Sequence, residues 1–472
     1  MRMYLGGQWV EGRDQIEVLN PFDGSVVDTV PRADSNNVQQ ALSSAERGAK
    51  IMARLSAYDR WKILKRAAEL IDLRKDELAR LISSEEAKVI SEGMGEVKRA
   101  VETIMVSAEE AKRIHGETIP SDADPGGRNH LGFTLRVPCG IVLAISPFNF
   151  PLNLVSHKVG PAIAGGNAVI IKPATDTPLS ALKLTEILLE AGLPPEGIQC
   201  LTGSGSVVGE ALIADRRVRK ISFTGSREVG EHICRSAGIK KLTMELGSNC
   251  PLIIMPDADI DAVVSAVVAT SYANAGQVCI STQRVLASRT IYSEFLDALQ
   301  PKVAALTTGN QFHDSTRVGP MVRESDAIRV ESWIKEAANE GARVVVGGHR
   351  EGANLAPAVV ADVKPGMRIC RDELFGPAIG VMPFDNIEDA IAQANSTNFG
   401  LSAGIFTRDI QWAVKFAREA ESGNIHVNWG PHWRADLMPY GGLKESGFGK
   451  EGPRYAIEEM TELKMVVFHA AN

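Results

Sequence analysis

From residue 140 onward the chain alternates short apolar runs with amphipathic stretches, and this alternation constrains the fold more than any other feature. The run GIVLAIS at 140–146 precedes an amphipathic stretch at 152–164, and AVIIKP at 168–173 precedes another at 178–191. The latter stops at Gly192 with prolines close behind, as a helix does at its C-terminal cap. Strands that alternate with helices at this spacing predict an α/β fold with a parallel sheet.

The alternation continues through IQCLTGS at 198–204, a helix near 206–214 and VRKISFTGS at 218–226. A second set starts near residue 247, so we expect a second α/β domain there. Its expected strands lie at 250–255, at 285–287 and in the runs ARVVVGG, IGVMPF and LSAGIFT, and its expected helices start at Ile260 and span 293–306.

The remaining segments have other patterns of polar and apolar residues. Apolar residues at helical spacing through 59–82 and 96–113 predict helices over most of 35–118. Residues 116–137 are polar, with prolines and glycines, and predict a loop or an extended excursion. The run LKMVVF at 463–468 is typical of a strand with no partner nearby in the sequence, which makes it a candidate for pairing across a subunit boundary.

Size and charge exclude several classes of protein. The 472 residues correspond to about three domains at roughly 150 residues each. The net charge is −7 and no basic block is present, so we expect no nucleic-acid partner. No apolar run approaches the ~20 residues that span a bilayer, and we expect no membrane partner.

The six cysteines are scattered, without a C-x-x-C pair or clustered histidines. This pattern favours reduced thiols in the cytoplasm over a disulfide scaffold or a metal site, and we expect no metal.

Two glycine-containing turns are candidates for binding phosphate. Gly203, Gly205 and Gly209 follow a strand, but one extra residue separates the last two glycines, and no acidic residue follows at the offset of a dinucleotide fingerprint. The segment is therefore either a dinucleotide-binding turn or an ordinary glycine-rich turn. Phe223–Ser226 ends a strand and enters a helix, which suits an anion but equally describes a capped helix.

Two residues are candidates for catalysis. Cys279, in NAGQVCIS, has small neighbours and is the best candidate for a nucleophile among the cysteines, although a structural cysteine fits as well. Glu245 ends the apolar run LTME, where burial of a carboxylate is costly unless its pKa is raised or it is paired. It is either a tuned general base or a residue on the exposed face of a strand.

The order of these pieces resembles the aldehyde dehydrogenase superfamily over essentially the whole chain. The shared segments are PFNFP (147–151), IIKPATDTPLSAL (170–182), FTGS (223–226), MELGSNCP (244–251), GQVCIS (276–281), DELFGP (372–377) and MPYGGLKESGFGKEG (438–452).

The resemblance implies a Rossmann-like cofactor domain (1–115 and 138–246), a second α/β catalytic domain (247–437) and a small β oligomerisation arm (116–137 and 455–472). It also implies a homodimer or homotetramer.

The resemblance also implies catalytic roles. Cys279 matches the nucleophile that forms a thiohemiacetal and then a thioester, and Asn149 matches the amide of the oxyanion hole beside the Cys279 N–H. Glu245 matches the base that activates water for thioester hydrolysis. Lys158 and Glu451 match positions that relay protons onward.

NADP or NAD is the implied cofactor. Lys172 matches a contact to the adenosine ribose, Gly225 and Ser226 the pyrophosphate turn, Glu373 the carboxylate on the nicotinamide ribose, and Phe375 the aromatic beside it. The rest of the implied cofactor site is Ser146, Pro147, Phe148, Thr175, Gly205, Gly209, Phe223, Thr224, Glu245, Leu246 and Gly247.

Thr175 stands three residues after Lys172, where many NAD-preferring members carry a glutamate. A carboxylate there would repel a 2′-phosphate and threonine does not, so we expect NADP to be accepted.

The implied substrate is a small polar aldehyde such as lactaldehyde, a semialdehyde, or a sulfo- or phosphono-aldehyde. Arg99 and Arg434 are candidates for holding an anionic tail, or else form structural ion pairs. Val278 stands where some anion-specific members carry arginine, which weakens the case for a doubly charged tail. The expected substrate site comprises Arg99, Asn153, His157, Val278, Ile280, His432 and Arg434.

Two alternatives stay open. A coenzyme A-acylating relative often lacks the base, so the presence of Glu245 argues against it. A non-catalytic member of the fold need not keep Cys279, Asn149 and Glu245 together.

Overall fold

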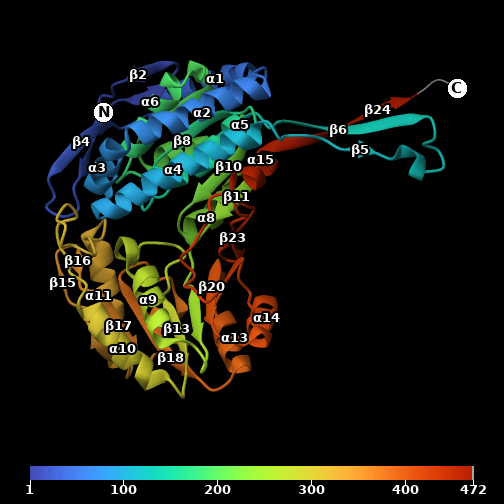
Figure 1. Cartoon of the computed structure of the whole chain (residues 1–472). Coiled ribbons are helices and arrows are strands. Elements are labelled where there is room, and N and C mark those ends of the chain that lie inside the picture. Colours follow the sequence, from blue (N-terminus) through green and yellow to red (C-terminus); the bar gives the residue numbers. More distant parts are fainter. Residues whose placement is uncertain (470–472) are drawn as a thin grey trace.

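Two mostly parallel sheets organise the computed structural model, which describes residues 1–469 (Figure 1). The eight-stranded sheet has the order β2-β1-β9-β8-β7-β10-β11-β23. Its parallel centre consists of β9 (Ile198–Cys200), β8 (Ala168–Lys172), β7 (Ile141–Ile145), β10 (Val218–Thr224) and β11 (Lys241–Glu245). The antiparallel margins are β1 (Met3–Leu5), β2 (Gln8–Val10) and β23 (Gly447–Phe448). The predicted parallel sheet is therefore confirmed.

Helices cover both faces of this sheet. Every residue of β7 and β8 is buried, as expected for strands enclosed on two sides. The covering helices are α1 (Ser35–Met52), α2 (Ala57–Leu73), α3 (Lys75–Glu86), α4 (Ile90–Ala111), α5 (Asn153–Ala164), α6 (Leu179–Glu190), α7 (Glu210–Ala214) and α8 (Arg227–Ser236). We call this sheet with its helices the N-terminal body.

The predicted helix over 59–82 is interrupted, which corrects the sequence-based expectation. Arg74 has φ −105° and ψ 18°, so α2 ends before it and α3 begins after it. On either side of this break, both helices pack against α4.

The second α/β body, the C-terminal body, has a seven-stranded sheet of order β14-β17-β18-β13-β12-β20-β21, parallel except for β14. Its strands are β14 (Arg343–Val346), β17 (Ala358–Ala361), β18 (Ala378–Phe384), β13 (Arg284–Ser288), β12 (Pro251–Ile254), β20 (Ser402–Phe406) and β21 (Asn424–Val427). Its longer helices are α9 (Ile260–Ser271), α10 (Tyr292–Ala304), α11 (Glu324–Asn339), α13 (Ile387–Asn395) and α14 (Ile410–Glu419).

A three-stranded sheet of order β24-β6-β5 projects from the N-terminal body (Figure 1). β24 (Thr461–His469) pairs along its whole length with β6 (His130–Pro138), and β5 (Thr118–Ile119) pairs with the far side of β6. The C-terminal strand thus has one partner in the same chain, β6, which lies far away in sequence but adjacent in space. Pairing of its other edge across a subunit boundary stays a prediction.

The C-terminal part of the projecting sheet starts at Thr461, six residues later than expected. Residues 455–459 belong to α15 (Pro453–Glu459), which packs on α4 and α5 and so lies in the N-terminal body. Among the helices of residues 1–469, none is long and apolar enough to cross a membrane.

Candidate active site

A cavity of about 1350 Å³ lies where the carboxyl ends of the N-terminal body's parallel strands face the C-terminal body. Parallel strands bring their carboxyl ends to one edge of a sheet, and ligands of α/β folds bind there. The residues expected to bind the cofactor line the cavity, with Thr175 as the exception. The lining includes Ser146, Pro147, Phe148, Lys172, Gly205, Gly209, Phe223, Thr224, Gly225, Ser226, Glu245, Leu246, Gly247, Glu373 and Phe375, together with Asn149 and Cys279.

The start of α8 forms one wall of the cavity. β10 ends at Thr224, and Ser226 caps α8 by accepting a hydrogen bond from the Val229 N–H at 3.4 Å. Gly225 donates its N–H to the carbonyl oxygen of Glu245 at 3.1 Å, which ties the ends of two neighbouring strands together. The N-terminus of α8 therefore faces a cavity large enough for an anionic ligand.

Lys172 ends β8 and is 6% exposed. Burial lowers the pKa of Lys172 to about 8, and Asp176 opposes this shift. Its ammonium group donates to the Pro173 carbonyl oxygen at 2.9 Å. Thr175 is exposed, and its hydroxyl donates to the Gly203 carbonyl oxygen at 3.3 Å. Thr175 thus connects the loop after β8 with the glycine-rich segment but lies outside the cavity wall.

Glu373 and Phe375 reach the cavity from the C-terminal body. Burial raises the pKa of Glu373 to about 7, while its Oε1 accepts the Ser248 N–H at 2.9 Å. The ring of Phe375 meets that of Phe148 edge-on, with 5.9 Å between centroids. Side chains of both bodies thus meet across the cavity.

Cys279 lies in a turn that follows a segment with left-handed backbone conformation. Asn274 and Ala275 have φ of 50° and 52°, and Gly276 has φ +68°. A Cβ at Gly276 would lie 2.1 Å from the Gly376 carbonyl oxygen, so only glycine fits there. Burial raises the pKa of the Cys279 thiol to about 12, and the thiol is neutral until a base removes its proton.

Glu245, the last residue of β11, is 3% exposed. Neither carboxyl oxygen has a hydrogen-bond partner within residues 1–469. Burial raises the pKa of Glu245 well above its usual range, and the negative charge of Glu451 adds to this shift. A buried carboxyl group without partners, beside a cavity that reaches a thiol, has the properties of a general base.

Lys158 and Glu451 form a buried ion pair with 2.9 Å between Nζ and Oε1. Lys158 also donates to the Thr224 hydroxyl at 2.7 Å. Burial opposes ionisation of Glu451, but Lys158 and Arg434 hold its pKa well below the usual range. The Glu451 carboxylate is thus ionised, and both residues lie close enough to Glu245 to act on its pKa.

Asn149 is fixed from several sides. Its Nδ2 donates to the Gln277 carbonyl oxygen at 2.8 Å, and its Oδ1 has no partner in the described part of the chain. The carbonyl oxygen of Asn149 accepts hydrogen bonds from Lys88 at 2.8 Å and from Asn274 at 3.2 Å. An amide nitrogen carries two hydrogens, so one donor of Asn149 is left for a ligand.

The residues expected to bind substrate lie apart from the cavity lining, and five of the seven form two groups. Val278 and Ile280 are buried with Tyr440 in a small apolar cluster around Cys279. Arg99, His157 and Arg434 form a polar chain through Asp436, in which His157 is fully buried and Arg99 is partly exposed.

In the polar chain, His157 Nε2 lies 2.9 Å from Asp436 Oδ1, which also accepts from Arg99 at 2.9 Å. Burial lowers the pKa of His157 to about 4, so the imidazole is neutral. Arg434 donates to its Nδ1 at 3.1 Å, which assigns the imidazole hydrogen to Nε2.

Asn153 and His432 belong to neither of these groups. The Oδ1 of Asn153 accepts from the Thr103 hydroxyl at 2.9 Å. Burial lowers the pKa of His432 to about 4.

Two residues of this region carry no expectation from the sequence. Asp436 joins Arg99 to His157, and the Tyr440 hydroxyl lies 3.3 Å from the Cys279 sulfur. The only signal for Tyr440 is its place in the shared segment at 438–452, and Asp436 has none.

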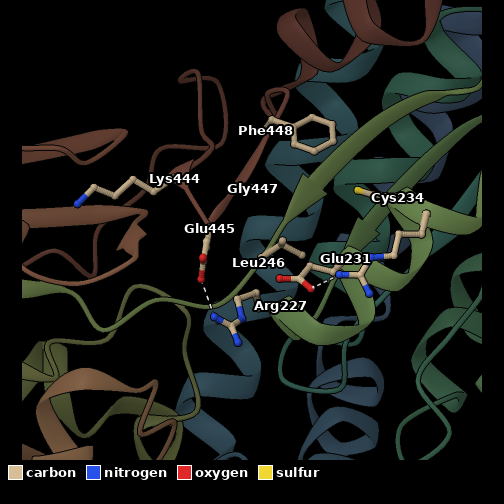
Figure 2. Close-up of a pocket in the computed structure, with 9 residues that line it drawn as sticks. Arg227, Glu231, Cys234, Leu246, Lys444, Glu445, Gly447 and Phe448 are labelled. Atoms are coloured by element: carbon tan, nitrogen blue, oxygen red, sulfur yellow. Dashed lines mark hydrogen bonds and ion pairs between the residues drawn. The ribbon is translucent and has the colours of Figure 1, made fainter.

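A smaller hollow of about 350 Å³ lies between α8 and the segment that contains β22 (Leu443–Lys444) and β23 (Figure 2). Arg227 and Glu445 form an ion pair across it, and Cys234 lies in its wall. It shares Arg227 and Leu246 with the large cavity, but none of the expected catalytic residues is among its lining within residues 1–469.

Comparisons with known proteins show the family of the chain. The model of the aldehyde dehydrogenase family matches residues 9–466. The 3-sulfolactaldehyde dehydrogenase of Priestia aryabhattai is 45% identical over 467 residues, which cover 99% of this chain and 98% of that protein.

Two solved structures are also similar. Aldehyde dehydrogenase 21 from Physcomitrella patens, in complex with the reaction product succinate, has a TM-score of 0.97 and 36% identity, covering 99% of this chain and 98% of that chain. Glyceraldehyde-3-phosphate dehydrogenase from Methanocaldococcus jannaschii, complexed with NADP, has a TM-score of 0.94 and 37% identity, covering 97% and 100%. The chain belongs to the aldehyde dehydrogenase family.

Proposed function

We propose that this protein oxidises a small polar aldehyde to its carboxylic acid, with NADP or NAD as the electron acceptor. One observation carries the proposal: Cys279, Asn149 and Glu245 border a single cavity, and both carboxyl oxygens of Glu245 lack partners within residues 1–469. The first is a nucleophile, the second a donor for an oxyanion and the third a base. A structural member of the family has no need of this set.

The cavity residues fit a dinucleotide. The buried hydroxyl of Ser146 has no partner in residues 1–469, and the N-terminus of α8 faces the same space. Lys172 would hold the adenosine ribose, Gly225 and Ser226 the pyrophosphate, and Glu373 the nicotinamide ribose, with Phe375 beside it. When bound, the nicotinamide supplies a hydride acceptor.

In the first half-reaction, the Cys279 thiol loses its proton to a base and the sulfur forms a bond to the aldehyde carbon. The free N–H of the Asn149 amide and the Cys279 N–H stabilise the oxyanion, and such donors typically contribute ~3–4 kcal/mol in the transition state. Loss of hydride then leaves a thioester on Cys279.

In the second half-reaction, Glu245 removes a proton from water, whose oxygen attacks the thioester carbon. The C–S bond breaks, the acid leaves and the sulfur is free again. The Lys158–Glu451 ion pair supplies a route for the proton from Glu245 onward. Coenzyme A acylation needs no such base, and the unpartnered Glu245 argues for hydrolysis.

For the substrate, we propose a small aldehyde with an anionic tail. The named relatives act on 3-sulfolactaldehyde or hold succinate, both of which are anions. Arg99 and Arg434 supply the positive charge near Cys279, and the Nε of each has no partner within residues 1–469. Asn153, His157, Val278, Ile280 and His432 are proposed to shape the rest of the substrate site.

We also propose that the N-terminal body is the cofactor domain, the C-terminal body the catalytic domain and the projecting sheet an oligomerisation arm in a homodimer or homotetramer. The position of the cavity between the bodies and the exposed apolar residues of the arm support this division.

The catalytic assignment is tested with Cys279→Ala and Glu245→Gln. We expect Cys279→Ala to abolish aldehyde oxidation. Glu245→Gln should give a burst of reduced cofactor, about one equivalent per active site, followed by steady turnover at least ~100-fold slower, because acylation survives and hydrolysis does not. Cys234→Ala is the matched control and should keep wild-type rates. Unchanged steady turnover of Glu245→Gln would remove Glu245 from the mechanism.

The substrate class is tested with Arg99→Gln on succinic semialdehyde and lactaldehyde. Arg99 is partly exposed, with 33% of its side chain accessible, so glutamine is tolerated there. We expect the KM for the anionic aldehyde to rise about tenfold or more, since a charge-assisted hydrogen bond is lost, while the neutral aldehyde is unaffected. Equal effects on both aldehydes, or none on either, would contradict an anion site at Arg99.

A further inference from the structure

The hydroxyl group of Tyr440 lies 3.3 Å from the Cys279 sulfur, and nothing in the proposed mechanism uses it. Tyr440 is 4% exposed and packs with Val278 and Ile280, the residues on either side of the nucleophile. The contact joins residues 161 positions apart, so it depends on the tertiary fold and not on local geometry.

The position of Tyr440 is fixed by backbone and side chain. Its N–H donates to the Glu451 carbonyl oxygen at 3.1 Å, and the Glu451 N–H donates back at 2.8 Å. The guanidinium of Arg434 lies over the ring, 3.9 Å from the centroid. Arg434 is itself held by Glu451 Oε2 at 3.1 Å and by His157 at 3.1 Å. The hydroxyl group thus cannot move far from the sulfur without breaking this arrangement.

The direction of the hydrogen bond follows from the surroundings. Burial raises the pKa of Tyr440 well above 10, so the phenol keeps its proton. Burial is the main cause of the raised pKa of the Cys279 thiol, and the hydrogen bond from Tyr440 opposes it. The titratable groups Cys250, Glu373 and Glu245 raise this pKa further. A thiolate only accepts, so Tyr440 must be the donor once Cys279 ionises.

We infer that Tyr440 is a further catalytic residue, which donates its hydroxyl hydrogen to the Cys279 sulfur and stabilises the thiolate that attacks the aldehyde. The inference rests on the proposed role of Cys279 as the nucleophile. No bond of Tyr440 breaks: the thiol proton goes to the base, and the phenol hydrogen stays on its oxygen. The cation over the ring draws electron density from it and makes the hydroxyl a stronger donor.

The test is the pH dependence of Cys279 alkylation by iodoacetamide in Tyr440→Phe, followed at the Cys279 peptide by mass spectrometry. Phenylalanine keeps the ring and removes the donor. We expect alkylation at pH 7.5 to slow about tenfold or more, with the midpoint of the pH profile rising by about one unit or more. Tyr272→Phe is the matched control, because Tyr272 is equally buried and donates to the Ala358 carbonyl oxygen at 3.0 Å, away from the sulfur. Its profile should match that of the wild type.

Arg434→Lys provides a second variant that leaves the hydroxyl in place. It should shift the profile in the same direction by less than Tyr440→Phe, and it decides the question if Tyr440→Phe does not fold. Unchanged profiles in the folded variants would overturn the role of Tyr440. If Cys279→Ala retains full turnover, the proposed function fails instead, and the two failures are therefore distinguishable.

Discussion

Lys172 is the residue on which we expect the choice of cofactor to depend. Its pKa is lowered to about 8 by burial, so its positive charge is present below pH 8 and is lost as the pH rises through 8. A 2′-phosphate would be attracted by the charged form only. We therefore expect kcat/KM for NADP, relative to that for NAD, to fall about tenfold between pH 7 and pH 9.

Steady-state kinetics with both cofactors across this range check the prediction, with Lys172→Met as the control. The variant should show a ratio that does not change with pH. A flat ratio in the wild type would mean that Lys172 does not face the 2′-position. An NAD preference above roughly a hundredfold at pH 7 would contradict NADP use altogether, whatever the role of Thr175.

The sequence indicated Cys279 as a candidate nucleophile and Glu245 as a candidate base. It did not determine whether either side chain is buried, so the direction of their pKa shifts stayed open. The raised pKa values of both groups come from burial between two bodies that the chain builds from distant segments. Tyr440 was visible within a shared motif, yet its contact with the sulfur spans 161 positions and no spacing rule reaches that far.

At the scale of elements, periodicity predicted most helices and strands, and it failed where tertiary contacts interrupt a pattern. The break at Arg74 has no proline or glycine to mark it, and both α2 and α3 pack on α4. The partner of β24 was equally hidden, since β6 lies more than 300 residues earlier.

A buried cluster of charges between α3, α4 and α5 also lacks a sequence signal. Lys88 forms an ion pair with Glu96 at 2.6 Å and donates to the carbonyl oxygen of Asn149, while Glu96 accepts the N–H groups of Leu152 and Asn153 at the start of α5. Charged residues in a helical pattern are normally exposed. Here they fix the backbone of Asn149, so the shape of the site depends on elements outside the shared motifs.

At the scale of the molecule, the C-terminal segment ties the parts together. β23 pairs with β11, beside Glu245, and β24 then continues into the projecting sheet. The cavity is lined by both bodies, and the segment that crosses between them pairs with the strand that ends at Glu245. The same segment ends in the arm seen in Figure 1.

The arm exposes apolar side chains on both faces. Leu463, Met465 and Val467 on one face of β24 are 60%, 47% and 40% exposed, and Phe468 on the other is 58% exposed. β24 is also an edge strand, with one row of backbone groups unpaired within residues 1–469. Exposed apolar edge strands are a liability in a monomer, so a second copy of this chain is expected to cover the arm.

We therefore expect the double substitution Met465→Glu with Val467→Glu to dissociate the oligomer. Burial of each side chain contributes roughly 1.5 kcal/mol or more, so their loss weakens association by at least about 100-fold. Sedimentation velocity at micromolar concentration measures the mass. Val344→Glu is the control, because Val344 is 39% exposed on β14, an edge strand of the C-terminal body. It should keep the wild-type mass. A monomeric wild type, or a double variant of unchanged mass, would show that the arm does not hold the assembly together.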